Sequence, residues 1–251
     1  MAVFVMGFSG LVAQMLLLRE LLVVFSGNEL SIGIILANWL ILEAIGCFFL
    51  GKRAENIKNK IETFAGITIL FSISLPAAVY LTRILKIILG VSIGEGLGFL
   101  PVLYSSFLIL SPVSLFHGAL FTFGCKVYSM FFTQEASSVG KVYVYEMVGT
   151  IAGGIIWTYL LIPYFHAFQM AMGIAMLNFF VCLVLLAPYW KTGRPQKIIT
   201  SVAGLFLFLS GYLVFAGGVD KLHHLSIKAQ WKDHNVVHYQ NSIYGNICVV
   251  K

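Results

Sequence analysis

Long apolar segments separated by short polar ones fill the first 218 residues of the chain. A helix needs about 20 apolar residues to cross roughly 30 Å of hydrocarbon, and each of these segments reaches or approaches that length. Backbone groups in lipid must be hydrogen-bonded within the protein, and the segments are far longer than β-barrel strands, so the pattern predicts helices. The predicted spans lie near residues 3–25, 31–51, 64–83, 98–123, 142–163, 166–188 and 198–217.

The pattern changes after residue 218, where charged residues and histidines precede an alternating, β-branched run. We predict a short strand over 236–239, a turn at Asn241 and Ser242, and a second strand over 243–250. A lone hairpin is marginally stable in water. We therefore expect an all-α polytopic membrane protein of about seven transmembrane helices (1–218), followed by a linker and the first strands of a truncated soluble domain (219–251).

Composition supports a membrane protein. Hydrophobic residues make up 59% of the chain and charged residues 10%, and the mean hydropathy is +0.93, outside the range of soluble globular domains. The first segment lacks a basic n-region, so it does not resemble a cleavable signal peptide. The four cysteines are widely spaced without a CxxC pair, which argues against a zinc site or a disulfide framework. They are Cys47, Cys125, Cys182 and Cys248.

The net charge of +6 reflects membrane orientation rather than nucleic-acid binding. Basic residues concentrate in the loops after the second, fourth and sixth spans, and the positive-inside rule makes that side and the N-terminus cytoplasmic. These residues are Lys52, Arg53, Lys58, Lys60, Lys126, Lys141, Lys191, Arg194 and Lys197. Seven spans would place the tail outside, although Lys221, Lys228 and Lys232 favour the reverse. If a span near residues 83–98 were miscounted, the tail would lie on the cytoplasmic side instead.

Polar side chains interrupt the first two spans. The turn at Ser26-Gly27-Asn28-Glu29 makes these spans a hairpin, in which residues whose numbers sum to about 57 lie at one depth. An ionisable group in mid-membrane costs roughly 2.5–3.5 kcal/mol, so it normally has a partner. We expect either a proton or substrate site, in which Glu43 is the deepest carboxylate, or packing contacts worth about 0.6 kcal/mol each. The candidate residues are Gln14, Arg19, Glu20, Asn38 and Glu43.

The remaining polar positions carry less chemistry. His117 is expected to be a hydrogen-bonded core histidine and Glu146 an interfacial charge. Gly149 and Gly153 have the spacing that allows a neighbouring helix to approach closely. The histidines of the tail lack a ligand spacing and are expected to be solvated; they are His223, His224, His234 and His238.

Motifs for nucleotide binding and hydrolysis are missing from the sequence, which contains no GxGxxG after a strand, GxxxxGK[ST], HExxH or GxSxG. No nucleophile, base and cofactor loop occur together. We therefore expect that residues 1–251 alone do not form an enzyme and hold no cofactor or metal.

The tail resembles the start of the polyamine aminopropyltransferases, or spermidine synthases, through Ser242, Tyr244, Gly245, Asn246 and Val249. The membrane part is similar to the helical domain that precedes such a synthase module in some bacterial proteins. The matching segments are Gly7-Phe8-Ser9-Gly10, Leu18-Arg19-Glu20, Gly27-Asn28-Glu29-Leu30, Asn38-Trp39-Leu40, Gly51-Lys52, Glu146-x-x-Gly149-Thr150-x-x-Gly153-Gly154 and Ile162-Pro163.

The resemblance implies that the full-length parent transfers an aminopropyl group from decarboxylated S-adenosylmethionine to a diamine such as putrescine. In that family an aspartate is the base and a glycine-rich loop holds the nucleoside, and neither element falls within residues 1–251. This chain would then be the inner-membrane anchor of a missing C-terminal synthase domain. It would contact the bilayer, and Glu20, Glu43 and Glu146 would be available to neutralise a polyamine or diamine.

Two alternatives stay open. A glycine followed by basic residues at Gly51-Lys52-Arg53 is also typical of major-facilitator carriers, which would make the chain a transporter-like bundle with a need for Gln14 or Glu43. A non-catalytic membrane scaffold is the other alternative, in which the polar hairpin only stabilises packing. The seven-span orientation conflicts with a cytosolic nucleoside substrate, and at this stage a miscounted span is the favoured explanation.

Overall fold

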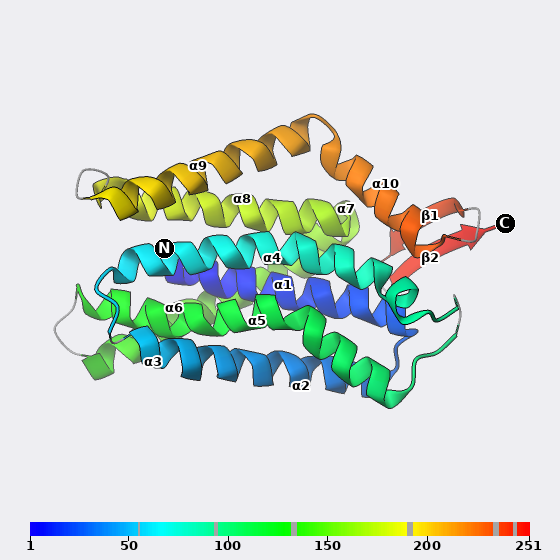
Figure 1. Cartoon of the computed structure of the whole chain (residues 1–251), viewed down its shortest axis with the longest axis horizontal. Helices are drawn as coiled ribbons and strands as arrows, with labels where there is room; N and C mark the ends of the chain where they lie inside the picture. Colours follow the sequence, from blue (N-terminus) through cyan, green and yellow to red (C-terminus); the bar gives the residue numbers. More distant parts are fainter. Residues whose placement is uncertain (55, 93–94, 132–134, 190–192, 233–235, 243–244) are drawn as a thin grey trace.

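The structure, a computed structural model, describes residues 1–54, 56–92, 95–131, 135–189, 193–232, 236–242 and 245–251. In this part of the chain, long helices run side by side along one axis, and a short helix and a β-hairpin lie together at one end (Figure 1). The helical elements are α1 (Ala2–Phe25), α2 (Glu29–Ile45), α3 (Gly51–Ala54), α4 (Lys60–Leu89), α5 (Phe99–Ser129), α6 (Glu135–Ile156), α7 (Ile162–Tyr164), α8 (Ala167–Leu186), α9 (Arg194–Phe215) and α10 (Gly218–Gln230).

Seven helical segments are long and apolar enough to cross a membrane: Ala2–Phe25, Glu29–Ala54, Lys60–Leu89, Phe99–Ser129, Ser138–Tyr164, Ala167–Tyr189 and Arg194–Phe215. This confirms the predicted helical, multi-pass fold and each predicted span. Two spans contain a π-helical turn, η1 (Gly46–Leu50) after α2 and η2 (Trp157–Leu161) after α6. A short 3₁₀ turn, η3 (Ala187–Tyr189), extends α8.

The turn between α1 and α2 forms as its residue types predict. Ser26 ends α1 in the left-handed region with a φ of 52°. Asn28 begins α2, where its Oδ1 accepts hydrogen bonds from the Ser31 backbone N at 3.1 Å and from the Ser31 hydroxyl at 3.2 Å. This cap satisfies one of the donors that every helix start leaves open.

Helix α1 is the centre of the bundle. It packs along α6 and also contacts α8, α4 and α5, whereas α2 packs mainly on α5 and only lightly on α1. Leu16, Leu17 and Leu21 of α1 are fully buried. The first two spans follow each other in the sequence and run antiparallel, but they pack mainly against different helices. Their polar faces are therefore buried chiefly against other helices and not against each other.

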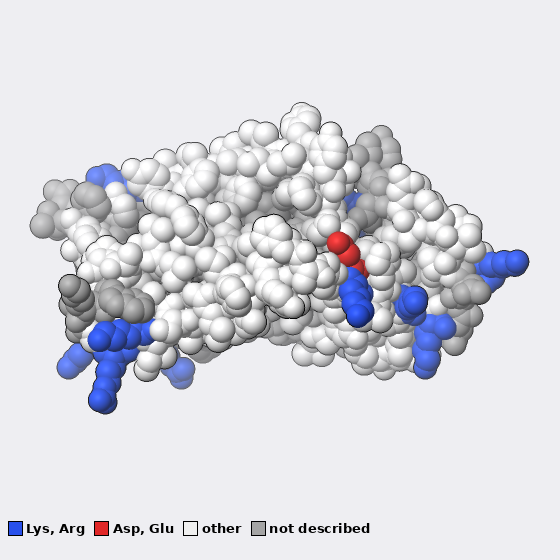
Figure 2. All heavy atoms as spheres, turned by 90° about the horizontal axis from the view of Figure 1, so that it is seen from above, with Lys and Arg blue, Asp and Glu red and all other residues white. Residues whose placement is uncertain are grey.

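On the face shown in Figure 2, charged side chains gather toward the two ends of the molecule and leave a wide uncharged stretch between them. One end, which we call the basic end, lies where α3 ends and α4, α6 and α9 begin. Its described basic residues are Lys52, Arg53, Lys58, Lys60, Lys126, Lys141, Arg194 and Lys197. Lys191 lies outside the described residues. The uncharged middle is what a hydrocarbon core requires.

The opposite end, which we call the hairpin end, carries α10 and the strands β1 (Val236–Ser242) and β2 (Gly245–Val250). The strands are antiparallel, and Asn241 and Ser242 pair with Asn246 and Gly245. The predicted turn at Asn241 and Ser242 was therefore wrong, because these residues continue β1. Ile243 and Tyr244 lie outside the described residues.

Two further expectations change at the hairpin end. The segment predicted as a linker instead forms α10, which lies against α4, α8 and α9. The third span, predicted to end at residue 83, continues to Leu89 before Gly90 ends it with a φ of 65°. Among the described residues of 83–98 there is no additional span, so the miscount favoured above has no support, and the hairpin lies opposite the basic end.

Candidate functional site

Two buried polar clusters stand out in the bundle. The inner cluster consists of Glu43, His117 and Glu146 on α2, α5 and α6. The outer cluster is centred on Glu20 and Arg83 at the hairpin end. Glycines position the first, whereas a network of charged hydrogen bonds positions the second.

Glycine contacts set the geometry of the inner cluster. A Cβ at Gly118 would lie 2.0 Å from the Glu43 carbonyl oxygen, and a Cβ at Gly10 would lie 1.9 Å from Nε2 of His117. A Cβ at Gly7 would lie 2.1 Å from the Glu146 carbonyl oxygen. Because no real Cβ occupies such positions, Gly7 and Gly118 allow α1 with α6 and α5 with α2 to meet backbone against backbone, and Gly10 leaves room on α1 for the His117 ring.

The predicted close approach at Gly149 is confirmed. A Cβ at Gly149 would lie 2.0 Å from the Phe4 carbonyl oxygen, and one at Gly153 would lie 3.0 Å from the Phe8 carbonyl oxygen. The neighbouring helix is therefore α1. This contact and the one at Gly7 hold α6 against α1, which brings Glu146 to the side of the bundle where His117 lies.

His117 and Glu43 form a short hydrogen bond inside the membrane region, with Nδ1 of His117 2.6 Å from Oε1 of Glu43. The other ring nitrogen, Nε2, lies 3.4 Å from the Met6 carbonyl oxygen. Trp39 and Phe71 flank the imidazole with ring centroids 6.1 and 5.8 Å away. His117 is thus a buried histidine with a partner on each nitrogen, as predicted.

Glu146 differs from its prediction. It is 8% exposed and interacts electrostatically with both His117 and Glu43. Its side chain makes no hydrogen bond to any residue in the described part of the chain. The expectation of an interfacial charge was wrong because the contact at Gly7 carries this turn of α6 into the bundle.

The outer cluster is built around the guanidinium of Arg83. Its Nε lies 2.8 Å from Oε2 of Glu20, and its Nη2 lies 3.4 Å from Oε1 of the same carboxylate. Arg83 is 1% exposed and Glu20 is 4% exposed. The guanidinium carbon also lies 5.1 Å from the ring centre of Phe168 on α8. One side chain therefore joins α4 to α1 and α8.

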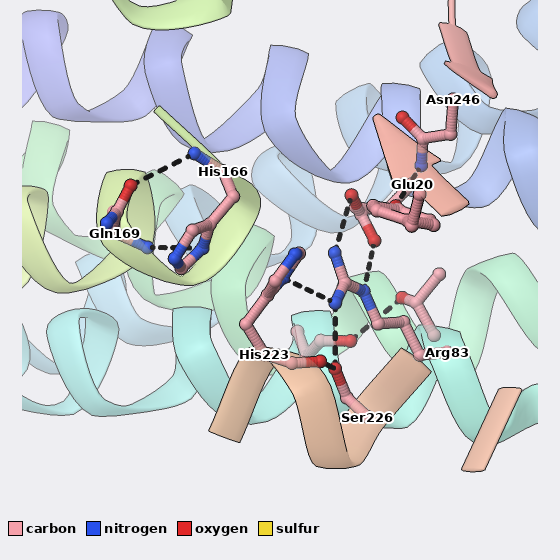
Figure 3. Close-up of polar contacts among 10 residues, drawn as sticks. Glu20, Arg83, His166, Gln169, His223, Ser226 and Asn246 are labelled. Carbon is pink, nitrogen blue, oxygen red and sulfur yellow. Dashed lines mark hydrogen bonds and ion pairs between the residues drawn. The ribbon is translucent and has the colours of Figure 1, made fainter. Parts of the chain in front are cut away.

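Helix α10 completes this network, as Figure 3 shows. Nη1 of Arg83 donates to the Ser226 hydroxyl at 2.7 Å and lies 3.0 Å from Nδ1 of His223. A guanidinium can only donate, so Nδ1 of His223 accepts and the imidazole is neutral. Burial, with the positive charge of Arg83, lowers the pKa of His223 to about 3.

A second set of contacts ties α10 to the start of α8. His166 caps α8, since its Nδ1 accepts a hydrogen bond from the Gln169 backbone N at 3.3 Å. Its Nε2 lies 2.8 Å from Oδ1 of Asp220 on α10, and Gln169 donates to the same oxygen at 3.0 Å. The His166 ring stacks on His223 at 4.0 Å. The hydrogen bond from His166 lowers the pKa of Asp220.

The hairpin joins the outer cluster through Tyr239 of β1. Its ring lies 5.6 Å from His223, and its hydroxyl accepts a hydrogen bond from Asn246 of β2 at 2.7 Å. Burial raises the pKa of Tyr239 to about 12, so it stays a neutral phenol. Tyr239 thus links β1, β2 and α10 into one unit.

A cavity of about 590 Å³ lies between the bundle and the hairpin. Its walls are mostly apolar, with two indoles and one guanidinium, and its lining includes Leu18, Arg19, Trp157, Ile162, Trp231 and Asn246. The volume is in the range of small-ligand pockets. The positive charge of Arg19 makes this cavity a poor site for a cationic amine.

The structure separates the five candidate residues of the first two spans. Glu20 bonds to Arg83, Asn38 donates to the Ser106 hydroxyl and the Leu103 carbonyl on α5, and Glu43 pairs with His117. Arg19 lines the cavity. Gln14 is half-buried on α1, away from these pairs. The polar positions are real, but they belong to different clusters.

Sequence reasoning missed Arg83 and His223. Arg83 was placed at the end of a span, and His223 was expected to be solvated, whereas it is 7% exposed. The available signal was the pattern of α10, in which Val219, His223, Ser226 and Ile227 share one buried face at helical spacing. His224 and His238 are exposed as expected, and His234 lies outside the described residues.

Among the described residues, no group of three or more His, Cys, Asp or Glu side chains is arranged to hold a metal ion. Comparison of the chain with protein-family models, with curated proteins and with solved structures found no match.

The first prediction concerns the buried ion pair. Replacing Arg83 by Met leaves Glu20 buried and unpaired, and we expect a loss of about 3–5 kcal/mol in the free energy of unfolding. The double variant Glu20→Leu/Arg83→Met should lose less than the sum of the single variants, because it removes both charges. Thermal unfolding in detergent measures both, with the exposed Arg53→Met as control. Additive losses would show that the pair is not coupled.

The second prediction concerns pH. His223 is neutral in the fold, with a pKa of about 3, and titrates near 6.5 when unfolded. The unfolded state therefore binds the extra proton between these values, so this contribution to stability is complete above pH 6.5 and falls as the pH decreases. At pH 5 the loss is about 2 kcal/mol. The measurement is the pH dependence of thermal unfolding, which His223→Gln should flatten and the exposed His238→Gln should not. Equal slopes in all three proteins would contradict the assignment.

Proposed function

We propose that this chain is the plasma-membrane anchor of a spermidine-synthase-like protein, and that the outer cluster holds the first strands of the appended domain on the bundle. The observation that carries the proposal is the bonding of Arg83 to Glu20 of α1 and to His223 and Ser226 of α10. A flexible tether would not need a buried guanidinium at this junction. The resemblance of the tail to the aminopropyltransferase start supports the identity of the domain.

The position of the hairpin bears on the chemistry of that domain. Aminopropyl transfer to a diamine uses decarboxylated S-adenosylmethionine, a cytosolic nucleoside, as the resemblance implies. The hairpin lies opposite the basic end, and the positive-inside rule assigns the basic end to the cytoplasm. With this orientation the appended domain would face away from the cytoplasm and would not be a conventional synthase. We therefore propose the anchor as the function of this chain, without a catalytic role.

The third prediction tests the anchor and its orientation. Alkaline phosphatase, which needs disulfides and so is active only outside the cytoplasm, is fused after Lys251 or after Lys58, and a matched set carries a fluorescent protein. We expect phosphatase activity only for the fusion after Lys251, and fluorescence only for the fusion after Lys58. The reverse result would place the hairpin in the cytoplasm and restore aminopropyl transfer as the expected reaction. Recovery of the chain in the soluble fraction would contradict the anchor.

A second candidate function is the handling of an amine inside the membrane, as a transporter-like bundle would do. The observation in its favour is that two acidic residues lie beside one imidazole in the inner cluster: Glu43 bonds to His117, and Glu146 interacts with both electrostatically. Ionisable residues inside a membrane commonly mark ion or substrate paths. Glu20 is not available for this role, because Arg83 already binds both of its oxygens.

The fourth prediction tests this candidate. Glu43→Gln keeps the shape of the side chain but removes its charge, so it should abolish binding or flux of radiolabelled putrescine in liposomes. The exposed Glu29→Gln is the matched control, since it lies on the same helix outside the cluster. Unchanged amine handling by a folded Glu43→Gln protein would rule out this function and would leave the anchor unaffected.

A further inference from the structure

We propose that Glu43, His117 and Glu146 form a proton-binding site inside the bundle, and that Glu146 holds the proton that exchanges. The inference does not depend on amine binding or on the anchor. It follows from the number of protons that the geometry of the inner cluster requires.

The Glu43–His117 pair requires two protons. The Met6 carbonyl oxygen can only accept, so Nε2 of His117, which lies 3.4 Å from it, carries a hydrogen. Nδ1 and Oε1 of Glu43 are 2.6 Å apart, and two lone pairs do not approach so closely, so one hydrogen lies between them. Whether this hydrogen belongs to the carboxyl or to the imidazole, the pair as a whole has no net charge.

If Glu146 were ionised, its charge would then be the one charge of the cluster without a compensating partner. It is 8% exposed, its carboxyl group has no hydrogen-bond partner among the described residues, and the pair beside it is neutral. An isolated carboxylate in such surroundings is costly, and a buried group of this kind normally takes up a proton instead. The neutral cluster therefore holds three protons: one on Nε2, one between Nδ1 and Oε1, and one on Glu146.

Among the described residues of the elements packed around Glu146, no cation takes the place of this proton. The titratable groups that interact with it are Glu43 and His117, with the thiols Cys47 on η1 and Cys125 on α5. Both thiols are uncharged at neutral pH. Helix α1 meets this turn of α6 through Gly7, which has no side chain.

Two cavities near the start of α1 share wall residues. The larger, about 350 Å³, is lined by Ala2, Phe64, Tyr128 and Tyr145 among others. The smaller shares Ala2 and Phe64 with it and also has Met6 in its wall. Met6, in the wall of the smaller cavity, is also the residue whose carbonyl oxygen lies 3.4 Å from Nε2 of His117.

The smaller cavity is narrow and mostly apolar, with a few polar side chains in its wall. Its volume is about 10 Å³, and Ser9, Thr68 and Asn178 supply polar groups to its wall. Ser9 donates to Oδ1 of Asn178 at 3.1 Å, whereas Nδ2 of Asn178 is buried without a partner in the described residues.

The fifth prediction tests the site on the full chain in nanodiscs by infrared difference spectroscopy during a pH titration. A protonated carboxyl group absorbs in a carbonyl region that carboxylates leave free. We expect such a band in the wild type at neutral pH, its loss at alkaline pH, and its absence from Glu146→Gln at neutral pH. Glu29→Gln, which changes an exposed carboxyl group, should leave the band intact.

Each outcome decides the proposal. If the wild type shows no titrating carboxyl band, the proposal is overturned whatever the variants do. A band that persists unchanged in Glu146→Gln would assign the proton to another carboxyl group and would also overturn it. Should Glu146→Gln fail to fold, Glu146→Asp replaces it, because the shorter acid keeps the proton but must shift the frequency of the band. Putrescine flux is measured separately, so a failure of the amine proposal is distinguishable.

Discussion

The buried guanidinium of Arg83 is the interaction on which the hairpin end of the molecule depends. A charge that is 1% exposed beside hydrocarbon must find its partners inside the protein, and Arg83 takes them from two helices that are distant in sequence. The carboxylate of Glu20 neutralises its charge, while Ser226 and His223 accept hydrogen bonds from its Nη1. As a result, α10 is positioned by the membrane bundle itself. The contact of Tyr239 with His223 then positions the strands that follow α10.

The two polar clusters follow different physical rules. The outer cluster contains a strong cation, so it is organised by charge compensation and its histidine stays neutral. The inner cluster has no strong cation among the described residues, and its charges are balanced by protons on weak acids and a weak base. Glycines make the difference possible, because helices that touch at Gly7, Gly10 and Gly118 leave no room for a long basic side chain.

Much of the fold was predictable from the sequence, because the length and apolarity of a membrane helix are local properties. The seven spans, the capped turn at Asn28 and the glycine contact at Gly149 all followed from short stretches of sequence. The partners of the polar residues did not follow. The sequence placed Gln14 level with Glu43, but the depth of a side chain says nothing of the direction in which it points, and α2 turns its polar face to α5. Likewise, the sequence around His223 predicted a solvated residue, because nothing in it indicates that α10 packs against Arg83.

The glycine contacts have a mechanical consequence. Helices α1, α2, α5 and α6 meet at distances that admit no additional methyl group, so they cannot slide past one another without a steric clash, and they form a rigid block. Helix α9 is different, since it lies at the edge of the bundle mainly against α8, and it continues into α10 through Gly217, whose φ is 69°. The close helix contacts therefore confine any large displacement among the described membrane helices to the periphery of the bundle, at α9.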